Sequence, residues 1–515
     1  MSATTTFQPL GGQPIEGATC VCIGAGRFLR AVLVPALREA GESVIVAQPR
    51  GTSFCEYMAA RPPQAASTYE VDCVAIDGSV ATTEQAIVAV GSLGSAAGAA
   101  AFMALPPVLP RLRVIGVGVT EAGVAMDSGS MLHLAEFLHR CMQAKPDRDW
   151  KLAVINTDNV PDNGDKIGSF VRGGRYVGGL PAAEGAAFAV WLDASVCFVN
   201  SMVDRIVAAR EGESEVPRAE PLPAKALVLE DLHGALPPAL TAGIAGVVVR
   251  GATGEIETDH CLKLRILNAV HSAVVYLGAL TPALRTTDAV IEHPAVFAYC
   301  GRLFDEDIAA IGAELGMDVQ TAVRPIYDEW IGRLQHPHFG LDCFWVTQNA
   351  SQKLGIRFWP TALAVLKHTD RQPSDALVFA IAAMLRYLTP AGGAVAEGEG
   401  EGVFEGRMDE KDEKDTKGRV DYVRGLAADA GAATYQYKDG DGTTPRALRP
   451  VGGGDATLEQ VLAAVVQVLA PVAGFDAAAH VEHTELAGRV AALLHRMLSG
   501  GEGALDVLLS LSPHA

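Results

Sequence analysis

A lysine, an asparagine and a histidine follow one another at spacings of five and three residues, as Lys263, Asn268 and His271. A lysine amine that is held uncharged can act as a general base near neutral pH. An amide N–H can stabilise negative charge that develops on a substrate oxygen. Together, the three side chains could take a proton from a hydroxyl group and stabilise the oxygen that remains. The alternative is a solvated lysine beside a histidine of the hydrophobic core.

The residues around these three side chains predict one helix with a buried face, because the apolar positions recur at intervals of three and four. These positions are Leu264, Leu267, Val270, Val274 and Leu277. At about 100° per residue the three polar side chains lie within an arc of about 140°, but Lys263 and His271 are about 12 Å apart along the axis. We therefore expect Lys263 at or just before the first turn, reaching over the helix start. There, the helix dipole and burial would both lower the lysine pKa.

A glycine turn near the N-terminus predicts a second site. An apolar run over 18–23 ends in Gly24-Ala25-Gly26, a helical pattern continues to about Ala40, and a second apolar run covers 43–47. In this context the first glycine makes a tight turn and Gly26 lets the backbone approach a pyrophosphate at the helix start. Leu29 stands where the usual third glycine would be. A plain strand-to-helix turn is the alternative.

The end of the second predicted strand bears on the choice of cofactor. An Asp or Glu that binds the ribose is expected there for NAD, but the sequence has Gln48-Pro49-Arg50. Gln48 can hydrogen-bond a ribose hydroxyl, and Arg50 can meet a 2′-phosphate. The sequence therefore leaves NAD and NADP both open.

Polar residues follow two further apolar runs. The run 152–155 leads into an Asn- and Asp-rich stretch that contains Asn159, and Asp204-Arg205 lies inside an apolar frame. Ligands of open α/β sheets bind at the carboxyl ends of the strands, so both places are candidates for substrate binding. The alternatives are an ordinary polar turn and a buried charge pair that serves the fold.

Composition narrows the class of protein. The net charge of −19 argues against nucleic acid, which needs clustered cations. Nine cysteines without CxxC spacing are typical of reduced thiols in a cytoplasmic protein. We see no signal peptide, and no apolar run reaches the roughly 18 residues that span a membrane. No zinc-ligand spacing is present, so we expect no metal.

The chain changes character once along its length. Strand-like and helical runs alternate up to about Glu255, and helical patterns dominate afterwards. We predict an α/β domain over 1–255 and a mostly α-helical domain over 256–515. A charged, glycine-rich insertion at about 397–419 has a composition that cannot build a core.

These features resemble the polyol-specific long-chain dehydrogenases, which include mannitol dehydrogenases and hexuronate reductases. The resemblance covers roughly 19–360. It rests on the glycine turn, Thr120-Glu121-Ala122-Gly123, the stretch from Asn156 to Asp165, Met202-Val203-Asp204-Arg205-Ile206, Lys263 to His271, and Ser351-Gln352-Lys353. It implies a Rossmann-like N-terminal domain, a helical C-terminal domain, and metal-independent hydride transfer between a nicotinamide and a secondary alcohol.

The resemblance also implies roles for individual residues. Lys263 would be the general base, Asn159 and Asn268 would hold the developing oxyanion, and His271 would orient the reacting hydroxyls. Asp204 and Lys353 would bind further hydroxyls of the substrate. The residues expected to line the cofactor turn are Gly24, Gly26, Phe28 and Arg30.

The resemblance leaves the substrate open. The leading candidates are mannitol with fructose and mannitol 1-phosphate with fructose 6-phosphate, and a hexuronate reductase is the alternative. The chain departs from mannitol 2-dehydrogenases at His260, where a glutamate is usual, and at Trp345, where an arginine binds substrate. These departures also motivate a third hypothesis, a nucleotide-binding protein of the same fold without turnover.

Overall fold

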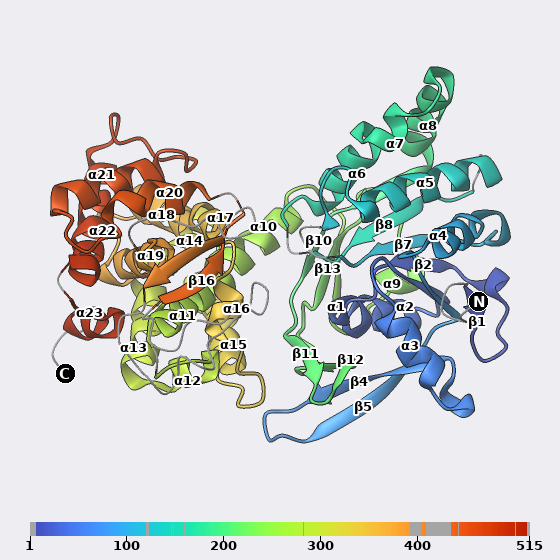
Figure 1. The fold of residues 1–515 in the computed structure, drawn as a ribbon, viewed down its shortest axis with the longest axis horizontal. Helices are drawn as coiled ribbons and strands as arrows, with labels where there is room; N and C mark the ends of the chain where they lie inside the picture. Colours follow the sequence, from blue (N-terminus) through green and yellow to red (C-terminus); the bar gives the residue numbers. More distant parts are fainter. Residues whose placement is uncertain are drawn as a thin grey trace. The chain divides into compact units, whose positions relative to one another are not determined.

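The structure, a computed structural model, describes residues 7–119, 123–145, 147, 149–158, 160–281, 283–391, 403–407, 434–440, 442–499 and 501–511. The chain divides into two compact units, Met1–His260 and Cys261–Ala515 (Figure 1). Glu255, our predicted boundary, is the first residue of α10 (Glu255–Leu262), the helix on which this division falls.

Six parallel strands form the central sheet of the first unit, in the order β6-β3-β2-β7-β8-β9, and the short strand β1 pairs antiparallel with β6. The strands are β1 (Gln8–Pro9), β2 (Cys20–Ile23), β3 (Val44–Gln48), β6 (Ala89–Ser92), β7 (Val114–Val117), β8 (Leu152–Asn156) and β9 (Val196–Val199). This is the strand order of a Rossmann sheet, whose ligand crevice lies where the order reverses, between β2 and β7. The predicted α/β class is confirmed.

Helices cover both faces of this sheet because its strands are apolar on both sides. Cys20 and Cys22 of β2 pack into one hydrophobic cluster, and Val21 and Ile23 pack into the other. The first cluster includes residues of α1 (Arg27–Ala31), α2 (Leu33–Glu39), α3 (Ser53–Ala60) and α9 (Pro238–Thr241). The second includes residues of α4 (Ala96–Met103), α5 (Gly129–Ala144), α6 (Asn163–Gly173) and α8 (Ala182–Ser195) (Figure 1).

Two smaller sheets and a short helix complete the first unit. One sheet has the order β10-β13-β14 and the other β11-β12-β4-β5. Their strands are β4 (Thr68–Val74), β5 (Val80–Ala86), β10 (Ser201–Val203), β11 (Val207–Arg210), β12 (Glu213–Ala219), β13 (Leu227–Glu230) and β14 (Val247–Arg250). The short helix α7 (Arg175–Gly178) follows α6.

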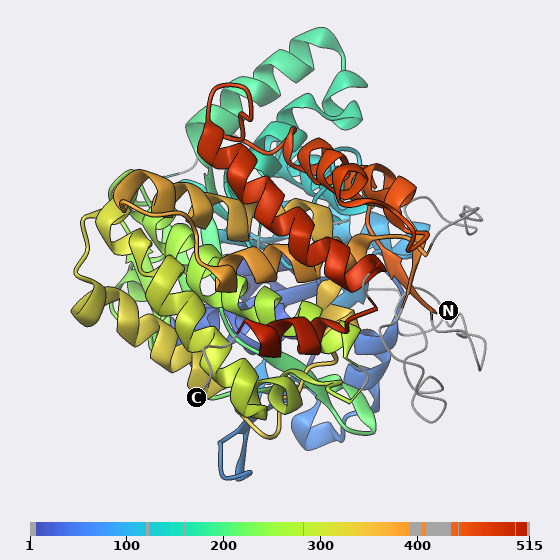
Figure 2. The ribbon, with the colours of Figure 1, turned by 90° about the vertical axis from the view of Figure 1, so that its left-hand side faces the viewer.

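The second unit is mostly helical, as predicted. Its central helices α11 (Asn268–Leu280) and α19 (Asp375–Leu388) pack against each other and are buried along nearly their whole length, which fits their apolar sequences. The other helices are α12 (Thr287–Glu292), α13 (Pro294–Leu303), α14 (Ala310–Leu315), α15 (Arg324–Leu334), α16 (Cys343–Thr347), α17 (Ala350–Lys353), α18 (Trp359–His368), α20 (Thr443–Leu448), α21 (Leu458–Leu469), α22 (Val481–Ser499) and α23 (Ala504–Ser510). Figure 2 shows α22 and α23 in red.

Four turns of π-helix lie within or at the start of helices of the second unit among its described residues. They are η6 (Lys263–Leu267), η7 (Phe304–Ile308), η8 (Val319–Val323) and η9 (Leu354–Phe358). Single π turns inside α-helices are rare and occur frequently at functional sites. One of them, η6, begins with Lys263, which the sequence analysis selected.

The predicted insertion is described only in part. Val403–Arg407, inside the range 397–419, forms strand β15 and pairs antiparallel with β16 (Thr434–Lys438). For these five residues the prediction of a segment without a core is wrong. Phe404 is buried and forms an aromatic cluster with Tyr435 and Tyr437. The rest of the predicted insertion lies outside the described residues.

Cysteines and hydropathy add two findings. All nine cysteines are free thiols, and burial raises the pKa of Cys22 to about 12. Cys20 and Cys22 therefore serve core packing, as expected for residues of a buried strand. In the part of the chain that the structure describes, no helix has the length and apolar character needed to cross a membrane.

Candidate active site

The glycine turn follows β2 directly, as predicted. Gly24 has φ +138°, and a Cβ atom there would lie 2.1 Å from the carbonyl oxygen of Gly118, so only glycine fits. At Gly26 the nearest atom to an added Cβ is the same oxygen, at 3.8 Å, which is ordinary contact. The fold therefore needs the first glycine, whereas the second leaves the backbone open to a ligand.

The missing third glycine is replaced by a glycine on the neighbouring strand connection. A Cβ atom at Gly118, one residue after β7, would lie 2.3 Å from Cδ1 of Leu29. Leu29 is buried. The close approach of helix and strand that the third glycine usually allows is achieved here because Gly118 has no side chain.

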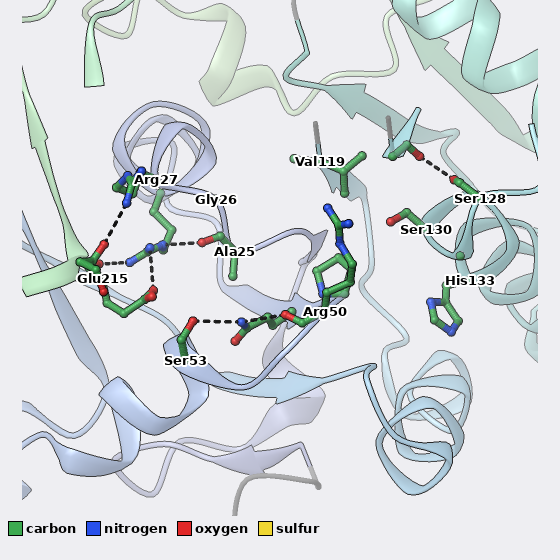
Figure 3. A pocket seen from close by; sticks show the side chains of 17 residues that line it. Ala25, Gly26, Arg27, Arg50, Ser53, Val119, Ser128, Ser130, His133 and Glu215 are labelled. Atoms are coloured by element: carbon green, nitrogen blue, oxygen red, sulfur yellow. Dashed lines mark hydrogen bonds and ion pairs between the residues drawn. The ribbon is translucent and has the colours of Figure 1, made fainter. Parts of the chain in front are cut away.

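A pocket of about 450 Å³ lies over this turn (Figure 3). Gly26, Arg30, Gln48 and Arg50 of the predicted cofactor residues line it, together with Ala25, Arg27, Pro49, Ser53, Gly118, Val119, Gly123, Ser128, Gly129, Ser130, His133, Ser214 and Glu215. Phe28 is not among the lining residues and packs against the hydrophobic cluster of α1 and α2.

Arg30 holds the turn in place. Its Nε donates to the carbonyl oxygen of Ala25 at 2.8 Å, and its Nη2 lies 3.1 Å from Oε2 of Glu215 on β12. The guanidinium also stacks 4.2 Å from the ring centre of Phe54. Burial lowers the pKa of Arg30, which the Glu215 carboxylate opposes. Arg30 thus contacts the glycine turn, α3 and β12 at once, and Glu215, the one carboxylate among the described residues that line the pocket, is paired with it.

Gln48 and Arg50 behave differently. The Oε1 of Gln48 accepts from the backbone N–H groups of Phe54 and Cys55, and its Nε2 donates to the Arg50 carbonyl and to Oγ of Ser53. A contact between Gln48 and a ribose would have to displace one of these bonds. The guanidinium of Arg50 extends into the pocket (Figure 3) and has no hydrogen bond or ion pair with any described residue.

Sequence reasoning missed the opposite wall of the pocket. Ser128, Ser130 and His133 come from the start of α5, where Ser128 accepts from the N–H of Met131 at 3.3 Å. The first N–H groups of such a helix favour anions. The signal was available, because a serine ahead of a helical pattern after a buried strand is typical of an N-cap.

Lys263 lies within a helix and not at its start. The eight residues of α10 run directly into η6, which begins at Lys263, and η6 runs into α11, which begins at Asn268. The predicted position at or before the first turn is therefore wrong. Lys263 is buried.

The π turn changes which residues share a face. The backbone N–H of Asn268 donates to the carbonyl oxygen of Lys263, five residues earlier. Because this bond closes one turn over five residues, Asn268 lies one turn above Lys263. His271 follows three residues later on the same face of α11. The structure thus brings the three predicted residues onto one helix face by a route that regular helix geometry does not give.

His271 is surrounded by cations and an aromatic ring. Its ring centre lies 5.7 Å from that of Trp330 on α15, and its Nε2 is buried without a hydrogen-bond partner among the described residues. Burial, followed by the charges of Arg357 and Lys353, lowers the pKa of His271 to about 3. The imidazole is therefore neutral at ordinary pH.

Lys353 and Arg357 come from α17 and η9. The Nζ of Lys353 donates to the carbonyl of Val346 at 2.6 Å. Nη1 of Arg357 donates to Oγ of Ser272 at 2.7 Å and to the carbonyl of Asn268 at 3.4 Å. Trp345 of α16 is 53% exposed.

Two predicted residues belong to the first unit. Asp204 follows β10, and its backbone N–H donates to the carbonyl of Ala226 at 2.9 Å. Its neighbour Arg205 donates to the carbonyls of Ala31 and Glu220, so that charge serves the fold. Asn159 lies outside the described residues, as do Thr120, Glu121 and Ala122.

The end of β8, close to Asn159 in sequence, is tied to its neighbours by side-chain amides. Asn163 Nδ2 donates to the carbonyls of Asp158 and Ser201, and Oδ1 of Asn200 accepts from the N–H groups of Gly164 and Asp165. His260 Nε2 lies 3.2 Å from the Ser201 carbonyl. Within the described ranges, no group of three His, Cys, Asp or Glu residues could hold a metal ion.

The parallel sheet with its glycine turn, followed by the helical unit with its polar helix face, defines a Rossmann-type α/β protein with a helical C-terminal unit. Residues 18–225 match the mannitol dehydrogenase Rossmann domain, and residues 256–399 match the mannitol dehydrogenase C-terminal domain. The chain therefore belongs to the mannitol dehydrogenase family.

Individual relatives are distant. The chain is 28% identical over 228 residues to mannitol 2-dehydrogenase of Cereibacter sphaeroides, covering 39% of this chain and 45% of the relative. It is 26% identical over 301 residues to altronate oxidoreductase of Bacillus subtilis, covering 54% and 59%. The matches thus span about half the length of these curated relatives. Mannitol 2-dehydrogenase of Pseudomonas fluorescens, solved as a ternary complex with NAD and D-mannitol, superposes with a TM-score of 0.64 at 16% identity, covering 99% of this chain and 97% of that one, which shows the shared fold.

Proposed function

We propose that this protein is a nicotinamide-dependent oxidoreductase that interconverts the secondary alcohol of a long-chain polyol and the corresponding ketone. The observation that carries the proposal is the π turn that puts Lys263, Asn268 and His271 on one helix face, in a chain of the mannitol dehydrogenase family. A lysine that served only as a solvated surface charge would not require a π turn, which is a rare local geometry.

Each of the three residues has a role that its chemistry allows. Lys263, as the uncharged amine, takes the proton of the substrate hydroxyl. The amide of Asn268, with that of Asn159, donates to the oxygen as negative charge develops on it, an interaction worth several kcal/mol in comparable sites. His271 is neutral and orients the hydroxyl groups. Asp204 and Lys353 bind hydroxyls farther along the substrate.

The pocket of the first unit fits a dinucleotide. Gly26 leaves room for the backbone to approach a pyrophosphate, and Arg27 and the start of α5 bring positive potential to it. A bound nicotinamide supplies the hydride acceptor or donor. Both NAD and NADP remain candidates, because the position of the ribose-binding acid is taken by Gln48.

The substrate pairs that lead are mannitol with fructose and mannitol 1-phosphate with fructose 6-phosphate. A hexuronate reductase is the second candidate, favoured by the 301-residue match to an altronate oxidoreductase. Oxidation of NADH and of NADPH is to be followed with fructose, fructose 6-phosphate and fructuronate. A nucleotide-binding protein without turnover would bind a dinucleotide and oxidise neither in any arm.

A single substitution tests the mechanism. Lys263→Ala should lower kcat by about 10²- to 10⁴-fold, because general-base catalysis contributes that much. The matched control is Lys367→Ala, which removes an exposed lysine of α18 and should leave kcat unchanged. Full activity of Lys263→Ala, with nucleotide binding and melting temperature as in the wild type, would exclude the assignment.

A further inference from the structure

The geometry points to an anionic substrate: Arg357 binds a carboxylate or phosphate group of the sugar through the Nε–Nη2 edge of its guanidinium. This inference rests on the proposed function, because it names the substrate class for the same helix face. It separates the acidic or phosphorylated sugars from the neutral polyols.

Arg357 is fixed against the helix that carries the proposed catalytic residues. Its Nη1 donates to Oγ of Ser272 at 2.7 Å and reaches the carbonyl of Asn268 at 3.4 Å. Ser272 is fully buried and itself donates to the same carbonyl at 2.8 Å. The guanidinium is thus fixed beside α11, at the level of Asn268 and His271.

The opposite edge of the guanidinium remains unpaired. Among the described residues, the buried Nε has no hydrogen-bond partner and Nη2 makes no hydrogen bond. Nε–H and one Nη2–H point in parallel from this edge. That fork matches the two oxygens of a carboxylate or a phosphate, and leaving a buried donor unmatched is costly.

Charge at the site is unbalanced in the same direction. Arg357 forms no ion pair with a carboxylate of the described residues, and its own charge and that of Lys353 oppose protonation of His271. Burial lowers the pKa of Arg357, but an arginine stays charged at working pH.

Arg265, a buried arginine of the same region, shows the contrast. Arg265, two residues after Lys263, pairs with Glu314 at 2.7 Å and also donates to the carbonyl of Pro360. A buried cation is expected to have such a partner. Arg357 lacks one among the described residues, so a ligand anion completes its surroundings.

The first test compares substrates. The wild-type full chain should reduce fructose 6-phosphate or fructuronate with kcat/KM at least tenfold above that for fructose. Arg357→Gln should lower kcat/KM for the preferred anionic sugar by about ten- to hundredfold, the usual range for hydrogen bonds to a charged group, and should lower that for fructose clearly less, because fructose carries no anionic group. Which of the two anionic sugars responds identifies phosphate or carboxylate. A wild-type preference for fructose, or an equal loss with all three sugars, would overturn the inference.

Two further variants control for folding. Arg357→Lys keeps the charge without the fork and should fall between wild type and Arg357→Gln. Ser272→Ala removes the anchor of Nη1 and keeps the fork, so it should weaken the anion preference less than Arg357→Gln does. Equal effects of Ser272→Ala and Arg357→Gln on neutral and anionic sugars alike would indicate a purely structural role.

A binding measurement makes the inference independent of turnover. Calorimetric titration of the full chain with inorganic phosphate and with D-gluconate should detect binding of one of them to the wild type and its loss in Arg357→Gln. If no sugar is reduced but this binding is found, the proposed function fails and the anion site stands. If neither anion binds and no anionic sugar is preferred, the anion site is wrong.

Discussion

The backbone N–H of Asn268 donates to the carbonyl of Lys263, so that five residues complete a single helical turn. In a regular α-helix the same five-residue step would rotate Asn268 about 140° away from Lys263. One hydrogen bond therefore decides whether the amine and the amide can act on the same atom. The helix therefore contains a rare π turn, η6, at the position where the two side chains are brought together.

An insertion and a deletion in the π turn should have unequal effects. Inserting one alanine after Lys263 makes the step six residues, which a regular helix turns about 120° out of line. Deleting Leu264 makes it four residues, which keeps both side chains on one face. We expect activity to fall more than 100-fold for the insertion and clearly less for the deletion. Circular dichroism and melting temperature check that both variants fold, and equal losses in two folded variants would contradict the argument.

Arg50 should distinguish the two nicotinamide dinucleotides. Because its guanidinium lines the pocket and has no partner among the described residues, Arg50→Ala should raise the Kd of NADP about tenfold and leave that of NAD unchanged, as expected for loss of a charged hydrogen bond to a 2′-phosphate. Arg27→Ala, in the same pocket, should weaken both nucleotides alike. Calorimetric titration with each nucleotide measures this, and a loss of NAD affinity in Arg50→Ala equal to that of NADP would rule the role out.

His271 should make the stability of the protein depend on pH. Its pKa of about 3 in the folded state lies below the ordinary value near 6.5, so the unfolded state binds more protons between these values. Stability is fully present above pH 6.5 and is lost as pH falls, by up to about 1.4 kcal/mol per pH unit. Urea unfolding at pH 7, 6 and 5 should show a shallower decline for His271→Asn. The exposed His368→Asn is the control and should follow the wild type; a His271→Asn slope equal to the wild-type slope would refute the burial argument.

Leu29 and Gly118 should be coupled in a double-mutant cycle. Gly118→Ala puts a methyl group 2.3 Å from Leu29 and should cost about 1–3 kcal/mol of unfolding free energy. In a Leu29→Gly background, which restores the usual third glycine, the same change should cost much less. Urea unfolding of the four proteins gives the coupling. Additive free energies would mean that the two positions do not compensate each other.

The sequence predicted what depends on local pattern. The apolar runs 18–23 and 43–47 became the parallel strands β2 and β3. The π turn was not predictable by counting periodicity, because counting assumes about 100° for every residue. Likewise, Gln48 looked available for a ribose in the sequence. Its commitment to the N–H groups of Phe54 and Cys55 exists only once α3 has folded beside it.

The candidate site shows the same division. Lys263, Asn268 and His271 could be selected as candidates because their types and spacing are local. Arg357 lies 86 positions later in the sequence than His271 and belongs to no motif, and its contact with Ser272 becomes visible only in the folded chain. Val403–Arg407 was assigned to an insertion without a core because charged neighbours hide its two-residue alternation.

The two glycines of the N-terminal turn are required for different reasons: Gly24 for folding and Gly26 for the proposed binding of the dinucleotide. At Gly24 an extra methyl group collides with the carbonyl of Gly118 in the folded chain, whereas at Gly26 it meets only an ordinary contact. A substitution at Gly24 should therefore lower the yield of folded protein. A substitution at Gly26 should leave folding intact and affect only the binding of the proposed dinucleotide. A folded variant is therefore no evidence that this turn can still bind its ligand.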